Sequence, residues 1–306
     1  MRRSISVADF DLVVLGGGSG GYAAALRGAQ LGLSVALIEK DKVGGTCLHR
    51  GCIPTKALLH AGEVADSARE SAQFGVNATF NSIDMVGVNS YKDGVIAGLY
   101  KGLQGLVKSR GITFVEGSGR LVSNNTVEVN GAQYVGKNII LATGSWLPAT
   151  SRDLGIDLLL QAGKGYSMTF DAVEKNLHYP AILVDDRVAM TPMGADLRMG
   201  GTMEISGIGS PMLMKRVQSI FKAAKNYYPN LPVEFPAQDK IWYGLRPLSP
   251  DGLPYIGRHS TYDNIVMAGG HAMLGLSLAA ATGKLVEEIV GGLETSIDIS
   301  AFNVER

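Results

Sequence analysis

The sequence predicts an α/β fold in which a domain built on a parallel sheet is joined to a smaller α+β domain with an antiparallel sheet. In the first forty residues, an apolar run, a cluster of glycines, an alanine-rich helical pattern and a second apolar run follow one another, as in a β-α-β unit. Beyond about residue 150, strand-like runs succeed one another without long helices, which favours antiparallel pairing. A length of 306 residues suits two such domains.

The composition excludes several classes of protein. The 28 Lys and Arg residues balance 28 Asp and Glu residues, so we expect no nucleic-acid partner. Charged residues at 18% and apolar residues at 46% are typical of a globular protein with little disorder. Glycine is in excess at 40 residues, which predicts many tight turns or close backbone approaches.

We expect a cytoplasmic protein, or one that is peripheral at the inner membrane. Two cysteines are too few for a secreted disulfide scaffold, which favours a reducing compartment. The basic start Met1–Arg3 does not predict a signal peptide, because Asp9 and Asp11 precede the first apolar run. The charge-poor residues 265–283 are interrupted by glycines, so we expect a strand, a turn and a helix there and no transmembrane segment.

The opening β-α-β unit is the most regular pattern in the chain. Residues 11–15 predict a buried strand, and the helical pattern that follows the glycines ends at Gly32. Residues 34–38 predict a second buried strand, which runs into Glu39. The whole pattern has the size of one mononucleotide-binding unit.

Three glycines between this strand and helix, Gly16, Gly18 and Gly21, form a G-x-G-x-x-G motif. Bare backbone amides at a helix N-terminus can hold a pyrophosphate that side chains would keep away. Glu39 is placed to accept the hydroxyl groups of a ribose. The unit therefore predicts a Rossmann-like dinucleotide site, with a glycine-rich turn that binds nothing as the alternative. The spacing does not distinguish NAD from FAD.

Further elements are predicted along the rest of the chain. Apolar residues recur at helical spacing from Val88 to Leu106, and again from Leu213 to Ala224 opposite a basic face. A Pro- and Gly-rich turn is predicted at residues 247–257, and a final helix at residues 276–290. Strands are predicted at residues 112–115, 120–122, 126–129, 138–142, 166–170, 181–185, 188–191, 197–205, 241–245 and 264–268.

The segment GGTCLHRGCIPTK at residues 44–56 carries both cysteines, and Ala-Thr-Gly follows at residues 142–144. With these motifs, residues 11–145 resemble the flavin domain of dihydrolipoamide dehydrogenases, in the pyridine nucleotide disulfide oxidoreductase family. The resemblance implies FAD as cofactor. It also implies that Cys47 and Cys52 form a redox pair beside the flavin ring, with Lys56 near the ring's reactive nitrogen.

The chemistry of the cysteine pair is consistent with that role. A thiolate near a helix N-terminus has a lowered pKa, and a C-x4-C pair can cycle between dithiol and disulfide. On the spacing alone, two reduced structural thiols remain the alternative.

The resemblance to dihydrolipoamide dehydrogenases does not extend to the second half of the chain. No second strand–GxGxxG–helix pattern follows residue 150, since Gly207-x-Gly209 lacks a third glycine and runs into Pro211. The His-Glu pair of that family has no counterpart among His178, His259 and His271. We therefore do not expect turnover of lipoamide with NAD.

Four ordered motifs in the second half resemble another family. They are GKGYS at residues 163–167, LRMGGTME at 197–204, GLRPLSPDGLP at 244–254 and GHAMLG at 270–275. Residues 146–306 thus resemble the C-terminal half of bacterial D-amino acid dehydrogenases and glycine oxidases, in the D-amino acid oxidase superfamily. The chain is predicted to be a hybrid of the two families, with the join near residues 143–146.

The second resemblance implies roles for particular residues. Arg246 would bind the substrate carboxylate, and the turn at residues 269–276 would lie against the flavin ring. A guanidinium can hold a carboxylate through two parallel hydrogen bonds, and a helix N-terminus can stabilise negative charge on the ring. A structural ion pair is the alternative for Arg246. Tyr166 could shape the substrate pocket, or it could be an ordinary aromatic of the sheet.

We therefore predict an FAD-dependent oxidoreductase that removes a hydride from a small amino acid. The predicted FAD-binding domain spans residues 1–148 and 247–306, and the substrate domain spans residues 149–246. The alternatives are a thiol-disulfide flavin reductase and an FAD-binding hybrid without turnover. The prediction requires the C-terminal strand to join the same parallel layer as the first strand.

The predicted site residues fall into two groups, and we expect no metal. The sequence names no electron acceptor, and an oligomer is compatible with it. The residues expected to take part in catalysis are Arg246, Cys47, Cys52 and Tyr166. The residues expected to bind the cofactor are Gly16, Gly18, Gly21, Glu39, Lys40, Gly45, Thr46, Lys56, Thr143, Gly144, Gly270, His271, Leu274 and Gly275.

Overall fold

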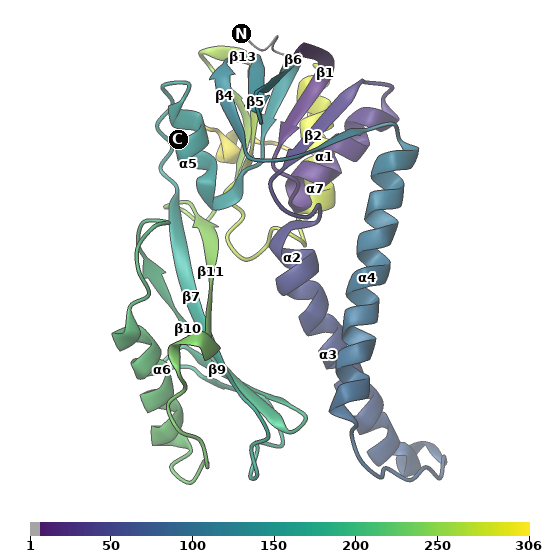
Figure 1. Ribbon diagram of the computed structural model, residues 1–306, viewed down its shortest axis with the longest axis vertical. Coiled ribbons are helices and arrows are strands. Elements are labelled where there is room, and N and C mark those ends of the chain that lie inside the picture. The colour runs from purple at the N-terminus through teal and green to yellow at the C-terminus, as the bar shows by residue number, and fades with distance from the viewer. Residues whose placement is uncertain (1–6) are drawn as a thin grey trace. The chain divides into compact units, whose positions relative to one another are not determined.

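The computed structural model describes residues 7–306 (Figure 1). Residues 1–6, which include the basic start considered above as a targeting segment, lie outside the described residues. The chain divides into two compact units. The first unit comprises the residues up to Pro54, Gly94–Gln161 and Pro247–Arg306, and the second comprises Thr55–Asp93 and Ala162–Arg246.

The first unit is built on a mixed sheet with a parallel centre. Its main path runs in the order β12-β13-β6-β1-β2-β3, and β4 and β5 extend it as an antiparallel ribbon from β6. The strands are β1 (Val7–Leu15), β2 (Val35–Glu39), β3 (Thr113–Glu116), β4 (Gly119–Ser123), β5 (Thr126–Val129), β6 (Ala132–Leu141), β12 (Tyr255–His259) and β13 (Tyr262–Gly269).

The C-terminal strand β13 joins the same parallel layer as the first strand. Ile265 of β13 lies opposite Ile139 of β6, and Ile139 lies opposite Val13 of β1, both in parallel register. On its other side β13 pairs antiparallel with β12. The requirement stated from the sequence is met, and the predicted α/β fold class is confirmed.

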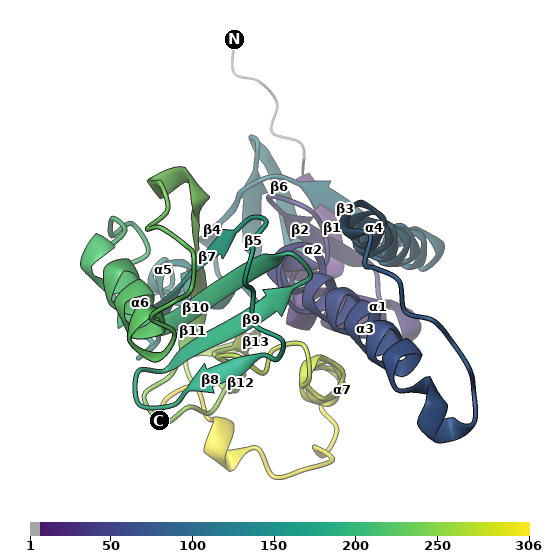
Figure 2. The same ribbon diagram turned by 90° about the horizontal axis from the view of Figure 1, so that it is seen from below.

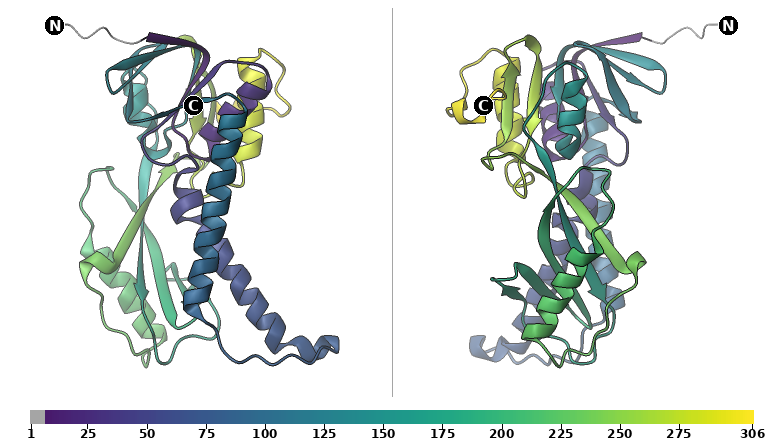
Figure 3. Two further views of the ribbon diagram at one scale, coloured as in Figure 1. Left: turned by 45° about the vertical axis from the view of Figure 1, so that its right-hand side comes forward. Right: turned by 90° about the vertical axis from the view of Figure 1, so that its left-hand side faces the viewer.

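Alternation along the central strands divides the core of the first unit between the two faces of the sheet. Leu12 and Val14 belong to one apolar cluster, and Val13 and Leu15 belong to the other. Helices α1 (Ser19–Gln30) and α7 (Ala279–Val290) pack side by side, and both contribute to the first of these clusters (Figure 3). Side chains from both faces of a parallel sheet are buried in this way when each face is covered.

Three helices connect β2 to β3, namely α2 (Gly45–Arg50), α3 (Cys52–Arg69) and α4 (Met85–Ser109), with a 3-10 turn at Ser71–Phe74. The sequence predicted α4 but not α2 and α3. Among the eighteen residues of α3, only Ala57 and Ala65 are buried, so the apolar periodicity that marks a packed helix is weak there. The first turn of α3 accommodates Pro54, which has no amide proton to donate.

The second unit contains a five-stranded sheet in the order β11-β7-β10-β9-β8. Strands β7, β10, β9 and β8 are joined antiparallel, as predicted. Helix α6 (Met214–Tyr227) packs against β9 and β10 and covers one face (Figure 2). The strands are β7 (Gln161–Phe170), β8 (Ala181–Leu183), β9 (Val188–Met193), β10 (Asp196–Ile205) and β11 (Ile241–Leu248).

Two local predictions are corrected by the structure. Strand β12 lies where the sequence predicted only a Pro- and Gly-rich turn, and helix α7 begins at Ala279 rather than at residue 276. Smaller elements are α5 (Leu147–Arg152) and the 3-10 turns Gly144–Trp146, Gln238–Lys240 and Ser300–Phe302. Within residues 7–306, no helix has both the length and the apolar character needed to cross a membrane.

Candidate functional site

The glycine loop between β1 and α1 is shaped by the protein's own backbone at two positions. Gly16 has a φ of +105°, and a Cβ there would lie 2.6 Å from the Ala142 carbonyl oxygen. A Cβ on Gly21 would lie 1.8 Å from the Gly16 carbonyl oxygen. Glycine at these positions therefore permits the tight turn and the close approach of α1 to the loop.

Gly18 differs from its neighbours because the protein itself does not require glycine there. It has an extended conformation at the N-cap of α1, and a Cβ would meet no protein atom within 4 Å. No side chain caps the helix from this position. Open space at a bare helix N-terminus is where a pyrophosphate can reach the amides, so the loop fits the diphosphate of FAD.

Glu39 at the end of β2 is held in place by the loop. Its Oε2 accepts a hydrogen bond from the Gly17 amide at 2.7 Å, and its Oε1 accepts one from the Asp41 amide at 3.0 Å. Each oxygen keeps a lone pair for a ribose hydroxyl. The side chain of the neighbouring Lys40 contacts Trp146, with its ammonium group 4.0 Å from the centre of the indole ring.

The segment before the cysteines is packed onto the glycine loop. The Gly44 amide donates to the Gly17 carbonyl at 2.8 Å. A Cβ on Gly45 would lie 3.0 Å from the Cα of Gly18. Thr46 follows on α2 with an exposed side chain. The predicted cofactor residues Gly45 and Thr46 therefore belong to the same loop cluster as the G-x-G-x-x-G motif.

The residues that follow β6 lie in the same unit. The Ala142 amide donates to the Leu15 carbonyl at 3.0 Å, so this turn is joined to the end of β1. Thr143 hydrogen-bonds through its hydroxyl to Thr150 at 3.2 Å. Gly144 has a φ of +57° and open space around it. Trp146, which stacks on Lys40, was not among the predicted residues.

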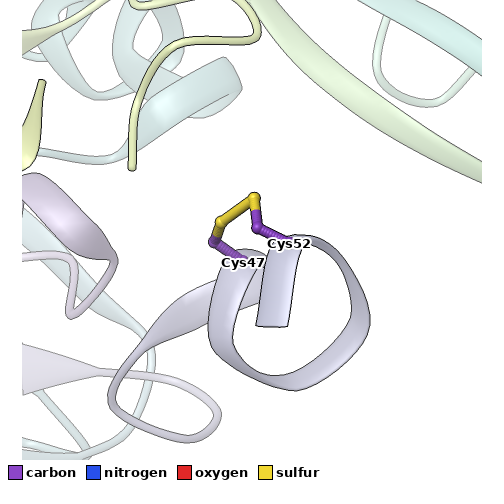
Figure 4. Close-up of a disulfide and its surroundings, with 2 residues drawn as sticks. All are labelled: Cys47 and Cys52. Carbon is purple, nitrogen blue, oxygen red and sulfur yellow. A yellow bond between two sulfur atoms is a disulfide. The ribbon is translucent and has the colours of Figure 1, made fainter. Parts of the chain in front are cut away.

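Cys47 and Cys52 form a disulfide that links α2 to the start of α3 (Figure 4). Their Cα atoms are 4.9 Å apart, and both residues are half-buried. The two thiols are thus paired, which excludes the alternative of two free structural thiols. Cys52 is the first residue of α3 and so lies at the positive end of the helix dipole. Lys56 follows one turn later and is exposed.

The C-terminal turn between β13 and α7 is rigidly hydrogen-bonded. Gly270 has a φ of +81°, and a Cβ there would touch Tyr255 and Leu160. The Thr282 hydroxyl donates to the Leu278 carbonyl, so Nε2 of His271 donates to the Thr282 oxygen at 2.9 Å. Burial lowers the pKa of His271, which favours the neutral ring.

The same turn presents Leu274 and Gly275. Leu274 is 57% exposed, and its amide donates to the His271 carbonyl at 2.8 Å. A Cβ on Gly275 would lie 3.7 Å from the Ser19 hydroxyl oxygen, so the turn comes near the start of α1. The Ala272 amide donates to the Pro247 carbonyl at 3.0 Å. The predicted cofactor residues of the two halves of the chain are therefore close together within the first unit, apart from Lys56.

Arg246 lies in the second unit, on β11 beside β7. A Cβ on Gly165 of β7 would lie 2.1 Å from Nη1 and 3.1 Å from Nη2 of Arg246, so the guanidinium covers this glycine. Nη1 donates a weak hydrogen bond to the Met203 sulfur at 4.0 Å. The side chain is half-buried, and no carboxylate in residues 7–306 pairs with it. The predicted ion pair, the alternative for this residue, is therefore not found in that range.

Tyr166 is the next residue after Gly165, and its side chain points to the opposite face of the sheet. It is 2% exposed and packs in the core beneath α6. Its hydroxyl donates to Oε2 of Glu204 at 2.5 Å and accepts the Leu213 amide at 3.0 Å. Alternation along β7 therefore separates Tyr166 from Arg246, and of the two interpretations of Tyr166 the structure favours an aromatic of the sheet.

A buried cluster around Glu204 was missed from the sequence. Lys164 is fully buried, donates to the Ser210 carbonyl at 2.7 Å and lies 3.8 Å from Glu204. Burial alone would raise the pKa of Glu204, but the hydrogen bond from Tyr166 and the charge of Lys164 keep it lowered. Lys164 and Glu204 lie within largely apolar strands, and this was the signal in the sequence that could have predicted a buried charged pair. Within residues 7–306, no group of acidic, His and Cys side chains gathers as a metal site would require.

Two family models described as FAD dependent oxidoreductase match the chain, one at residues 87–289 and the other at residues 11–83. Dihydrolipoyl dehydrogenase 2 of Haloarcula marismortui is 46% identical over an alignment of 142 residues, which covers 44% of this chain and 30% of that protein. The dihydrolipoyl dehydrogenase of Chlamydia trachomatis is 47% identical over 139 residues, with the same shares. The chain thus spans about 30% of the length of these curated relatives.

Solved structures share the fold over nearly the whole chain. Glycine oxidase from Geobacillus kaustophilus superposes with a TM-score of 0.63 and 18% identity, covering 97% of this chain and 99% of that one. L-proline dehydrogenase from P. horikoshii superposes with a TM-score of 0.66 and 16% identity, covering 99% and 98%. The two resemblances predicted from the sequence, one for each part of the chain, are confirmed.

Proposed function

Because this chain belongs to the family of FAD-dependent oxidoreductases, with FAD as its cofactor, we propose that it oxidises a small amino acid at the carbon that carries the amine. The observation that carries this proposal is Arg246. Its half-buried guanidinium has no carboxylate partner within residues 7–306, and burying a cation without a counter-ion is costly. A substrate carboxylate would supply that counter-ion through two parallel hydrogen bonds.

The cofactor residues of the first unit have separate tasks in this proposal. The amides around Gly18 would bind the pyrophosphate at the start of α1, and Glu39 would accept the ribose hydroxyl groups. When bound, FAD supplies a two-electron acceptor for the hydride on the substrate Cα, and the amine loses a proton as the C=N bond forms. The turn from Gly270 to Gly275 would line the ring.

Arg246 is joined through the chain to that turn. It is followed by Pro247, whose carbonyl accepts the Ala272 amide at 3.0 Å. Orientation of the substrate Cα–H toward the ring would supply much of the rate of hydride transfer. Glycine oxidase and L-proline dehydrogenase, which share the fold, are named for small amino acids, and this supports the substrate class.

Reduction of purified protein by candidate substrates tests the proposal. Without oxygen, D-alanine or D-proline should bleach the yellow colour of the FAD-bound protein, as in D-amino acid dehydrogenases. Arg246→Ala should slow bleaching about a hundredfold, because two charge-assisted hydrogen bonds are lost. Arg216→Ala, which removes an exposed arginine from α6, should bleach at the wild-type rate. Equal rates in all three proteins would contradict the proposal.

A second candidate function is a thiol-disulfide flavin reductase. The disulfide between Cys47 and Cys52 supports it, together with the identity of 43–47% to dihydrolipoyl dehydrogenases over part of the chain. Bleaching by dihydrolipoamide, with a charge-transfer band that disappears in Cys47→Ser, would favour this route. No bleaching by dihydrolipoamide would exclude it, whatever the outcome with amino acids.

A further inference from the structure

On one face of the sheet in the second unit, several strand positions are occupied by glycine or serine. Alternation along β7 places Gly165 and Ser167 on the face opposite Tyr166 and Met168, which pack under α6. In the antiparallel register, Gly200 of β10 lies opposite Ser167. We call this surface the glycine face, defined by Gly165, Ser167, Arg198, Gly200 and Arg246.

Arg198 is the second cation on the glycine face. It lies two residues before Gly200 on β10, and its Nη2 donates to the Ser167 hydroxyl at 3.2 Å. Its side chain is half-buried, and burial lowers its pKa. Within residues 7–306 no carboxylate pairs with it. One hydroxyl satisfies only one of the five N–H groups of a guanidinium.

The two guanidinium groups lie over neighbouring positions of one strand. Arg246 covers Gly165, and Arg198 reaches Ser167, two residues further along β7. Positions two residues apart on a strand are separated by about 7 Å. Two cations held over such neighbouring positions repel each other, and an anion between or beside them would offset that repulsion. The absence of a side chain at Gly165 gives the Arg246 guanidinium its place over the strand, because a Cβ there would lie 2.1 Å from Nη1 and push Arg246 aside.

We propose that Arg198 is a specificity-determining residue that binds a second carboxylate, so that the preferred substrate is an amino acid with an acidic arm. The inference rests on the proposed function, in which Arg246 binds the first carboxylate. A molecule with two carboxylates a few carbons apart has the length to reach both guanidinium groups. A neutral side chain would leave Arg198 buried without a counter-ion.

Succinate and butyrate are matched probes, because both have four carbons and neither can be oxidised as an amine. Their binding to the FAD-bound wild-type protein is measured by the change in the flavin absorption spectrum and by the shift in the melting temperature. We expect succinate to bind at least about tenfold more tightly than butyrate, the effect of one added charge-assisted pair. Arg198→Met should abolish this ratio and leave butyrate binding unchanged. Arg198→Lys keeps the positive charge but cannot donate two parallel hydrogen bonds to a carboxylate, so it should give an intermediate ratio.

The controls separate this inference from the proposed function. Arg216→Met removes the same charge from α6, on the other side of the sheet, and should keep the wild-type ratio. Equal binding of succinate and butyrate to the wild-type protein overturns the inference, and so does tight succinate binding in Arg198→Met. Butyrate binding that is absent from the wild-type protein, or unaffected by Arg246→Ala, overturns the proposed function instead. If Arg198→Met does not retain FAD, the wild-type ratio and Arg198→Lys decide.

Discussion

The proposed binding groups of the two units differ in kind. In the first unit the glycine loop offers backbone amides, and the nearest charged side chain, Glu39, is held by the Gly17 amide. In the second unit the glycine face offers two cations, Arg198 and Arg246, that lack counter-ions within residues 7–306. The difference teaches where to look for function. In the first unit the proposed site is indicated by the absence of a side chain at Gly18, and in the second it is indicated by two guanidinium groups without a carboxylate partner within residues 7–306.

The charges of the first unit are, by contrast, closely paired. Both side-chain oxygens of Glu287 on α7 accept hydrogen bonds from Arg27 on α1, which joins the two helices. Asp11 accepts hydrogen bonds from Lys137 and Ser34, and Asp251 accepts them from Arg306. These pairs join the sheet and helices of the first unit, whereas in the second unit Arg198 and Arg246 have no carboxylate partner within residues 7–306, and we propose that a ligand supplies it.

Gly21→Ala should produce the largest effect. Its Cβ would lie 1.8 Å from a backbone oxygen of Gly16, so the loop or α1 must move. We expect a loss of about 3 kcal/mol or more in the free energy of unfolding of the first unit, together with loss of FAD. Urea unfolding followed by the fluorescence of Trp146, in a Trp242→Phe background, measures it. A variant that binds FAD and unfolds like the parent would contradict the close packing.

Tyr166→Phe should produce the next largest effect, confined to the second unit. The substitution leaves Glu204 and the Leu213 amide without the hydroxyl that both use, in a site 2% exposed. We expect a loss of about 1–3 kcal/mol. The fluorescence of Trp242 in a Trp146→Phe background reports it, with Tyr243→Phe, which is 41% exposed, as the control. A large loss of substrate binding without a loss of stability would show that Tyr166 lines the pocket after all.

Gly18→Ala sharpens the comparison because it should affect the ligand alone. A Cβ at this position meets no protein atom within 4 Å, so stability without FAD should change by less than about 0.5 kcal/mol. The affinity for FAD should fall about tenfold or more, since the methyl group would occupy space next to the pyrophosphate. Titration of the FAD-free protein with FAD measures this change. Unchanged affinity would mean that the open space is not used by the cofactor.

Much of the first unit could be predicted from the sequence because its signals are local. Residues 11–39 carry the strand, the glycines, the helix and the acidic residue in one continuous pattern, and the structure places them as predicted. Strand β12 was missed because Pro254 and Gly257 are typical of a turn, whereas its pairing with β13 is set by residues further along the chain. Helix α3 was missed because little of it is packed.

The second unit was harder to predict because its features depend on pairing between strands. The sequence left open whether Tyr166 shapes the substrate pocket or is an ordinary aromatic of the sheet, and only the pairing of the strands shows that it faces α6 while Gly165 faces Arg246. Arg198 lies in the motif LRMGGTME, but the sequence gave it no role, since the absence of a counter-ion is a property of the folded chain. The available hint was the glycines at 200 and 201, inside a predicted strand, and at 165, directly before one, because such glycines mark close approaches.

Lowering the pH should destabilise the first unit more than the second. The effect of each single group should be the smallest of the predicted effects. Hydrogen bonds from Lys137 lower the pKa of Asp11, and those from Arg27 lower the pKa of Glu287. Stability from such carboxylates is present above their ordinary values of 3.8 and 4.5 and is lost as the pH falls. Burial lowers the pKa of His271, so its contribution also decreases as the pH falls below about 6.5. All three groups belong to the first unit.

The two tryptophans allow each unit to be followed separately through this titration. Trp146 lies in the first unit and Trp242 in the second, with 42% and 43% of their surfaces exposed. Between pH 7 and pH 3, the unfolding midpoint reported by Trp146 should fall further than that reported by Trp242, because Glu204 is the one carboxylate of the second unit with a lowered pKa among residues 7–306. Asp11→Asn should lower the Trp146 midpoint at pH 7 and reduce its further fall at pH 3. If both midpoints fall equally, hydrogen-bonded carboxylates do not stabilise the first unit more than the second. The contrast with the unpaired arginines of the second unit would then be wrong.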